Sequence, residues 1–206
     1  LCSRPSLAHA LLDAIDGRRV PANHLSADLV RQLRNLKNAE LDSKIARVWG
    51  QVRDTPADKA ALIEHYKRLL STPGAGPKAD IELGRAVFAK TCQQCHTLFA
   101  TGGKVGPDLT GSNRANLDYI LENIHDPSAV IPKEYAVTLI ELKNGRIVSG
   151  IVKAETPQAL TVVTANETLT VSVQDIESRK ASDQSMMPDN LVDNLKPAEL
   201  RDLIAY

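Results

Sequence analysis

Three side chains that stand close together in the sequence form the clearest chemical motif of the chain. Cys92 and Cys95 are separated by two residues, and His96 follows directly. A C-x-x-C-H run is the attachment signature of a c-type haem. Two cysteines three positions apart on one turn can reach the two vinyl groups on one side of a porphyrin, and the next imidazole can bind the iron. The sequence therefore predicts one covalent haem c, with its iron, at Cys92, Cys95 and His96.

Two other kinds of site use a similar cysteine pair. A redox-active pair of the thioredoxin type should follow a strand in a βαβ pattern, whereas here Asp80 begins a predicted helix that leads to Cys92. A zinc site would need further ligands, but no second cysteine pair follows, and His125 is the only other histidine after residue 78. The pattern therefore favours haem.

The residues around this motif resemble the class I cytochromes c. The segment from Gly84 to the cysteines resembles the N-terminal helix of that family, and residues 199–206 resemble the C-terminal helix that crosses it. Residues 106–109, Gly-Pro-Asp-Leu, resemble the loop whose proline carbonyl accepts the proximal imidazole N–H. The resemblance implies that Pro107 orients His96 and makes it a better ligand.

The same resemblance places the sixth iron ligand in an irregular loop before the last helix, often with a proline after the methionine. The two methionines of the chain, Met186 and Met187, stand directly before Pro188. This order favours Met187 as the axial ligand, with Met186 as the alternative. A middle helix is predicted over residues 116–124, and His125, on or just after that helix, is a rival ligand. A methionine ligand raises the reduction potential and closes the iron to exogenous ligands.

Arg114 is a further candidate cofactor-binding residue. A guanidinium group matches a carboxylate with two parallel hydrogen bonds, so Arg114 could pair with a haem propionate. A solvated arginine fits the sequence equally well. The pattern leaves both readings open.

From Tyr135 to Ile176 the pattern changes from helices to strands. The Asn144-Gly145 pair is a strong signal for a tight hairpin, and short runs of β-branched residues and leucine follow it. The sequence predicts a four-stranded antiparallel meander at about residues 135–176. This meander is inserted between the predicted middle helix and the segment that contains Met186 and Met187.

This combination resembles the planctomycete-type haem-binding domain over roughly residues 80–206. The motifs that carry the resemblance are 105–111, Asn113-Arg114, Asp126-Pro127-Ser128, the β insert and Met186-Met187-Pro188. It implies a C-terminal electron-transfer module, not itself an enzyme, of a large periplasmic or otherwise exported protein, and a start at Leu1 fits a piece of such a protein. Its partner would be a redox protein or a fused dehydrogenase.

The sequence of the first part of the chain, up to about residue 70, predicts only helices. Apolar residues recur at helical spacing, Ser26 suits a helix N-cap, and Thr55-Pro56 suits a helix start. Four such helices could form a small bundle or the end of a helical-repeat solenoid. The proline- and glycine-rich segment 71–77 marks a boundary between a helical domain, 1–75, and a haem domain, 79–206. The predicted fold class is mainly α, a helical domain followed by a cytochrome c-like domain with a β insert.

Composition narrows the classes of function. The 206 residues carry 25 Lys and Arg against 25 Asp and Glu, which argues against binding nucleic acid or anionic membranes through bulk charge. No apolar run approaches the ~20 residues of a membrane span. Residues 1–78 hold 13 basic and 8 acidic side chains, and residues 79–206 hold 12 and 17. The acidic haem region would attract a basic partner surface.

Two alternatives to electron transfer remain open at the level of the sequence. If neither methionine binds the iron, the chain would be a haem enzyme or a ligand sensor with an open distal site. If the helical region and the β insert are adaptors, it would be a protein-interaction module in which haem is structural.

Overall fold

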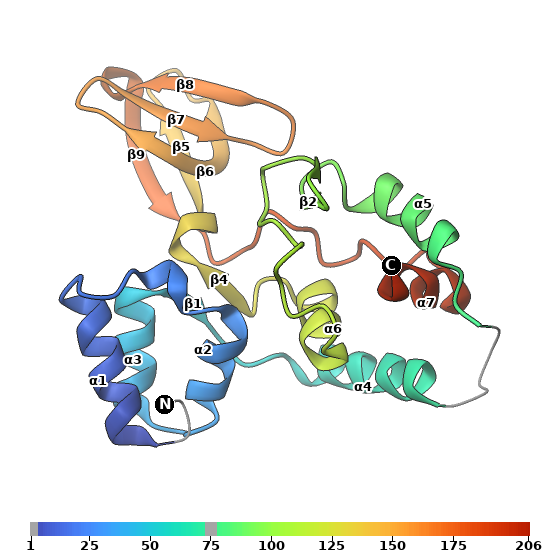
Figure 1. The fold of residues 1–206 in the computed structure, drawn as a ribbon. Coiled ribbons are helices and arrows are strands. Elements are labelled where there is room, and N and C mark those ends of the chain that lie inside the picture. Colours follow the sequence, from blue (N-terminus) through green and yellow to red (C-terminus); the bar gives the residue numbers. More distant parts are fainter. Residues whose placement is uncertain (1–3, 73–77) are drawn as a thin grey trace.

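The structure, a computed structural model, describes residues 4–72 and 78–206 and shows three groups of elements (Figure 1). Helices α1 to α3 form one group, α4 to α7 a second, and an antiparallel sheet a third. The helices are α1 (Pro5–Asp16), α2 (Ala27–Arg34), α3 (Ala39–Val48), α4 (Ala57–Ser71), α5 (Ile81–Thr91), α6 (Leu117–His125) and α7 (Pro197–Ala205), with short 3-10 helices at Ala22–His24, Lys133–Tyr135 and Val173–Asp175. The strands are β1 (Gly50–Val52), β2 (Thr97–Leu98), β3 (Thr101–Gly102), β4 (Val130–Pro132), β5 (Val137–Leu142), β6 (Ile147–Glu155), β7 (Ala159–Val163), β8 (Thr168–Ser172) and β9 (Ile176–Ala181).

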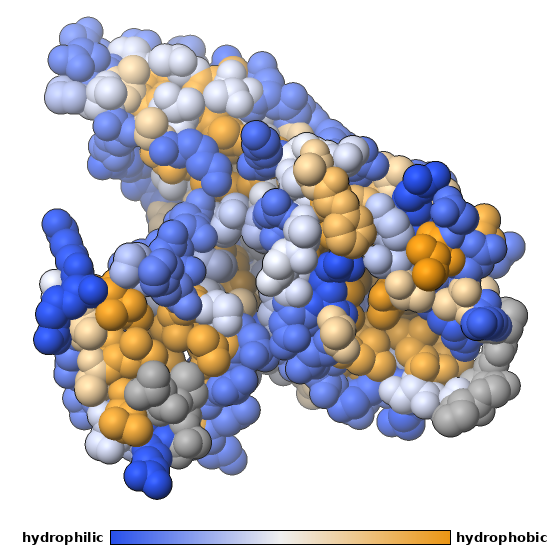
Figure 2. Space-filling model, in the orientation of Figure 1, coloured by the Kyte–Doolittle hydropathy of each residue, from blue (hydrophilic) through white to orange (hydrophobic). Residues whose placement is uncertain are grey.

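The first three helices enclose an apolar core of their own. Ser26 accepts a hydrogen bond from the Leu29 N–H and so caps α2, as its position predicted. Trp49, which directly follows α3, is buried and donates its indole N–H to the Leu25 carbonyl over 2.6 Å. On the face drawn in Figure 2, apolar side chains gather over this group and again around α5 and α7. The two clusters are separate cores.

The sequence predicted only helices in the N-terminal part, but the structure also contains a short strand there. Strand β1 pairs antiparallel with β4, which lies 80 residues further along, with Gly50 opposite Pro132 and Val52 opposite Val130. Val130 is buried in the core formed by α1 to α3. A three-residue strand has too few residues to show an alternating pattern, so only its distant partner identifies it.

The β insert has five strands where four were expected. Its order is β8-β7-β6-β5-β9, so the last strand returns to pair with the first. β9 spans Ile176–Ala181 and is largely exposed, with Leu139 of β5 opposite Lys180. Because β9 is charged and exposed, it has no run of apolar residues that would predict a strand. Only its backbone hydrogen bonds to β5 identify it. The inner face of the sheet buries an apolar core of Ile140, Val148, Leu160, Val162 and Val171.

Helices α5 and α7 cross in close contact. A Cβ atom added at Gly84 would lie 2.0 Å from the Asp202 carbonyl oxygen, so only glycine allows this approach. Phe88 and Leu203 are buried in the core between them, and the Asp202 side chain accepts a hydrogen bond from the Asp80 N–H. The contact expected between these two helices is therefore present.

Helix α4 packs against α6, although the sequence assigned α4 to the helical domain. The rings of Tyr66 and His125 stack with centroids 4.9 Å apart, and Lys67 Nζ lies 2.6 Å from Asp118 Oδ1. The boundary segment 71–77 falls mostly on residues 73–77, which lie outside the described part of the chain. The division into domains 1–75 and 79–206 stays a prediction, and contacts cross it.

The fold class needs one correction. Within the described residues, seven α-helices accompany a five-stranded antiparallel sheet, so the chain is not plainly mainly α. Among these helices, none has both the length and the apolar character needed to cross a membrane.

Candidate haem site

The cysteines stand where α5 ends. Asp80 caps this helix, since its carboxylate accepts the backbone N–H groups of Glu82 and Leu83 at 2.9 and 3.1 Å. The helix stops at Thr91, and the next residues form a tight turn in which the Cys92 carbonyl accepts the N–H groups of both Cys95 and His96. The turn therefore brings both thiols and the imidazole together at one helix end.

His96 is held from behind by the loop that follows. Its Nδ1 lies 2.9 Å from the Pro107 carbonyl oxygen, which is the contact that the family resemblance implied. Because a carbonyl can only accept, Nδ1 carries the proton and Nε2 keeps its lone pair for a metal. A Cβ atom on Gly106 would lie 2.5 Å from His96 Cε1, so this glycine lets the loop backbone lie directly against the ring.

One part of this support was missed by the sequence analysis. A Cβ atom on Gly103 would lie 1.9 Å from the Gln94 carbonyl, and the Gly103 N–H bonds the Gln93 carbonyl over 2.8 Å. The Thr97 hydroxyl donates to the Gly103 carbonyl over 2.8 Å. The available signal was the pair of glycines at 102 and 103, seven and eight residues after Cys95. They allow the β2–β3 hairpin to fold back on the cysteine turn.

Burial sets the protonation states of this site. It raises the pKa of the Cys92 thiol to about 11, with a smaller contribution from Cys95. It also lowers the pKa of His96, against the opposing effect of the hydrogen bond to Pro107. At neutral pH the site therefore presents a protonated thiol at Cys92 and a neutral imidazole at His96, and both cysteines are free thiols.

These residues fit a c-type haem. Two free thiols stand three positions apart on one turn, and the adjacent imidazole offers Nε2 while its other nitrogen is held by a backbone carbonyl. That donor set supplies two thioether links and one axial ligand. Within residues 4–72 and 78–206, no group of three or more His, Cys, Asp and Glu side chains is arranged to hold a metal ion by itself.

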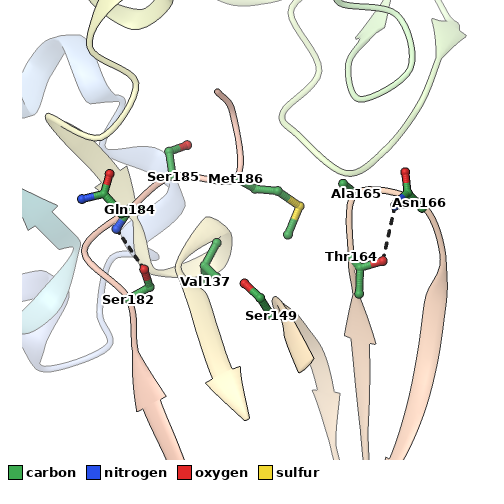
Figure 3. A pocket seen from close by; sticks show the side chains of 9 residues that line it. All are labelled: Val137, Ser149, Thr164, Ala165, Asn166, Ser182, Gln184, Ser185 and Met186. Atoms are coloured by element: carbon green, nitrogen blue, oxygen red, sulfur yellow. Dashed lines mark hydrogen bonds between the residues drawn. The ribbon is translucent and has the colours of Figure 1, made fainter. Parts of the chain in front are cut away.

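The two methionines lie in the segment between β9 and α7, and their surroundings differ. The Met187 N–H donates to the Ser185 hydroxyl over 3.1 Å. Met186 extends toward Ala165 and Asn166 in the β7–β8 turn and lines a cavity of about 430 Å³ beside the sheet (Figure 3). The structure thus accounts for Met186 by its place against the β insert.

Arg114 is engaged with backbone groups. Its Nε donates to the Leu109 carbonyl over 3.0 Å and its Nη1 to the Tyr206 carbonyl over 3.3 Å. The guanidinium also lies over the Phe99 ring, 5.1 Å from its centroid. Arg114 therefore links the loop behind His96 to the end of α7, which is a more defined role than a solvated side chain.

His125, the rival ligand, lies at the contact of α4 and α6. It is 2% exposed, stacks on Tyr66, and its Nε2 has no hydrogen-bond partner among the described residues. Burial lowers its pKa, against the opposing effect of Asp193. The stack on Tyr66 explains its burial, and its role as a ligand stays a prediction.

A comparison with known families identifies part of this region. Residues 79–137 match the family described as cytochrome c oxidase, cbb3-type, subunit III. A cytochrome c domain is present. The matched segment contains α5, the cysteine turn, the Pro107 loop and α6, and it ends where β5 begins. The match supports haem c binding and haem-based electron transfer for this domain. The sheet and α7 lie beyond the match, and α7 completes the helix pair at Gly84.

Proposed function

We propose that residues 79–206 of this chain bind a single haem c covalently and transfer single electrons. Cys92 and Cys95 would form the thioether links, and His96 and Met187 would be the axial ligands. The observation that carries the proposal is the His96–Pro107 hydrogen bond of 2.9 Å, which leaves Nε2 of a neutral imidazole with its lone pair, in the residue that directly follows the free thiol of Cys95. When bound, the haem supplies an iron that alternates between ferric and ferrous states.

The protein's own residues perform three tasks in this reaction. Pro107 keeps the His96 ring in one orientation, so little rearrangement accompanies a change of iron charge. Met187 would supply the second ligand to the iron and would thereby exclude water and exogenous ligands. Arg114 holds the loop behind His96, since its Nε donates to the Leu109 carbonyl, and its other N–H groups would pair with a haem propionate. The position of Met186 against the sheet supports Met187 as the axial residue.

We also propose the wider setting that the resemblance implies. The chain would be the C-terminal module of a larger periplasmic or otherwise exported protein of the planctomycete type, with a class I cytochrome c arrangement around its haem. A redox protein or a fused dehydrogenase would supply the electron. Residues 79–206 carry more acidic than basic side chains, so a basic surface on that partner would be attracted to them. Raising the ionic strength should then slow electron exchange.

The deciding experiment is expression of the exported chain together with a c-type cytochrome maturation system. We expect one haem per chain that resists acid–acetone extraction, and a Cys92→Ala/Cys95→Ala variant from which all haem is extracted. A colourless wild-type protein that has passed through the maturation system would refute the proposal.

The axial ligand is tested by a matched pair of methionine variants. We expect Met187→Ala to lose the weak far-red band of sulfur-ligated ferric haem, to become high-spin and to show a lower reduction potential. Met186→Ala should keep all three properties. If both variants resemble a wild type that binds cyanide rapidly, the site is open, and the haem enzyme or sensor alternative replaces electron transfer.

A further inference from the structure

Residues 183–189, here called the methionine loop, form the first part of the connection from the sheet to α7 and contain Met186 and Met187. Both ends of this loop are bonded to residues that lie far away in the sequence. The partners come from β1, from α4 and from the segment after α6. The proposed function requires this loop to present a thioether at a fixed position, so what fixes the loop matters for the axial bond.

The first end of the loop is bonded to β1 and to Ser128. Gln51 Nε2 donates to the Asp183 carbonyl over 2.8 Å and to the Ser128 carbonyl over 3.4 Å. The Ser128 hydroxyl accepts the Ser185 N–H over 3.0 Å, and Ser128 itself is 1% exposed. Because β1 is paired with β4, this end of the loop rests on a fixed part of the backbone.

The second end is bonded to Lys59 on α4. Its Nζ lies 2.6 Å from Asp189 Oδ2 and 3.2 Å from Asp126 Oδ1. Asp126 is 0% exposed and also accepts hydrogen bonds from both terminal guanidinium nitrogens of Arg53, Nη2 and Nη1, at 2.6 and 2.8 Å. Lys59 therefore bridges a buried carboxylate, fixed by Arg53, to a carboxylate that lies two residues after Met187.

From these contacts we infer that Lys59 is a positioning residue for the axial methionine. Asp189 is the point at which the methionine loop is tied to the buried Arg53–Asp126 pair, and Lys59 makes that tie. A loop fixed at both ends has fewer conformations to lose when its thioether binds a metal, so the axial bond becomes stronger. The inference rests on the proposed function, because it assumes that Met187 is the ligand.

The variant Lys59→Met removes the ammonium group and keeps most of the side-chain volume. Arg53 still pairs with Asp126 in this variant, so the buried carboxylate is not left alone. Lys67→Met is the matched control, because Lys67 lies on the same helix and makes an equally short ion pair, 2.6 Å, with Asp118 of α6 rather than with the loop. Both variants remove one positive charge from α4.

Two measurements on the holoprotein test the inference. The first is hydrogen exchange of the backbone amides in residues 183–189, which we expect to be faster in Lys59→Met and unchanged in Lys67→Met. The second is imidazole binding to the ferric haem, because imidazole must displace the methionine. A partly exposed ion pair contributes up to about 1 kcal/mol, which corresponds to roughly fivefold tighter imidazole binding in Lys59→Met.

Asp189→Asn removes the same ion pair from its other side. The Asp189 side chain is 46% exposed, and this variant should reproduce both effects. The double variant Lys59→Met/Asp189→Asn should add little to either single change. If Lys59→Met, Asp189→Asn and Lys67→Met show equal hydrogen exchange in residues 183–189 and equal imidazole affinity, the role of Lys59 is overturned. The proposed function would still stand in that case. A wild-type holoprotein without the sulfur band would overturn the proposed function, and the role of Lys59 with it.

Discussion

The two sides of the proposed haem site are built in different ways. On the His96 side, the contacts join residues close in sequence: the Pro107 carbonyl is 11 positions from His96, and Gly106 bonds the Cys95 carbonyl. On the methionine side, the contacts of the loop ends span 132 residues from Gln51 to Asp183 and 130 from Lys59 to Asp189. One side is a local structure of the matched cytochrome c segment, and the other depends on the packing of α4, β1 and α6.

The difference suggests that the two sides can be damaged separately. Changes near the cysteine turn should affect attachment of the haem, because they alter the thiols and the imidazole directly. Changes in the Arg53–Asp126–Lys59 cluster should leave attachment intact and weaken the axial methionine and the stability of the whole chain. The following variants test that separation, in order of decreasing expected effect.

Arg53→Met should have the largest effect, on the methionine side. It leaves the buried Asp126 carboxylate with Lys59 alone, and removing one partner of a buried ion pair costs about 3 kcal/mol or more of unfolding free energy. Covalent haem content should stay at the wild-type level. Urea unfolding measures the first effect, and haem per chain measures the second.

The control for this variant is Arg47→Met. Arg47 pairs with Asp16 over 2.8 Å, but both side chains are about half exposed, at 59% and 45%. Such a surface pair contributes little to stability. Equal loss of stability in the two variants would show that the Asp126 cluster does not carry the structural role assigned to it.

Gly106→Ala tests the His96 side. Its Cβ atom would lie 2.5 Å from His96 Cε1 and 2.9 Å from Nδ1, so the ring or the loop must move and the bond to Pro107 must lengthen. Such overpacking destabilises by about 1–3 kcal/mol, and we expect a reduced yield of attached haem. Gly111→Ala, where nothing lies within 4 Å of the added atom, should behave as wild type. A normal haem yield from Gly106→Ala would show that the loop adapts freely.

The pH dependence of stability should show the smallest effect. Burial by itself would raise the pKa of Asp126, but the bonds from Arg53 and Lys59 outweigh it and hold that pKa below its usual value. The unfolded chain therefore takes up this proton at a higher pH than the folded chain does. Stability from Asp126 is present above pH about 4 and is lost as the pH falls through the lower, folded-state value.

This effect is measured by urea unfolding between pH about 5 and pH about 2. We expect Asp126→Asn to be less stable at neutral pH and to lose less further stability on acidification than wild type. Parallel stability curves for the two proteins would argue against a depressed pKa at Asp126.

Several parts of the structure follow from short stretches of sequence. Asp80 caps α5 and Ser26 caps α2 because a side-chain oxygen needs only the N–H groups two or three positions ahead. The Pro107 carbonyl meets His96 within one loop. Gly84 marks a helix crossing because the family resemblance supplied its partner, α7. Each of these contacts is local or belongs to a recognisable motif.

Other parts of the structure could not be predicted from a short stretch of sequence. Strand β9 carries charged, exposed residues and exists through its hydrogen bonds to β5. The α4–α6 contact crosses the segment that composition marks as a boundary. Asp126 and Ser128 were noted only as part of a motif, and their partners Arg53, Lys59 and Ser185 could not be assigned from spacing.

By itself, the sequence determined the donor groups of the proposed haem site, which are two thiols and an imidazole on one turn, and the family resemblance added a proline carbonyl behind the ring. These residues are near neighbours in the chain, so local backbone geometry brings them together. The tertiary structure decided how the methionine loop is held, because its anchors are separated from it by up to 132 residues. Contacts over such separations form only when α4, β1 and α6 pack, and no spacing in the sequence encodes them.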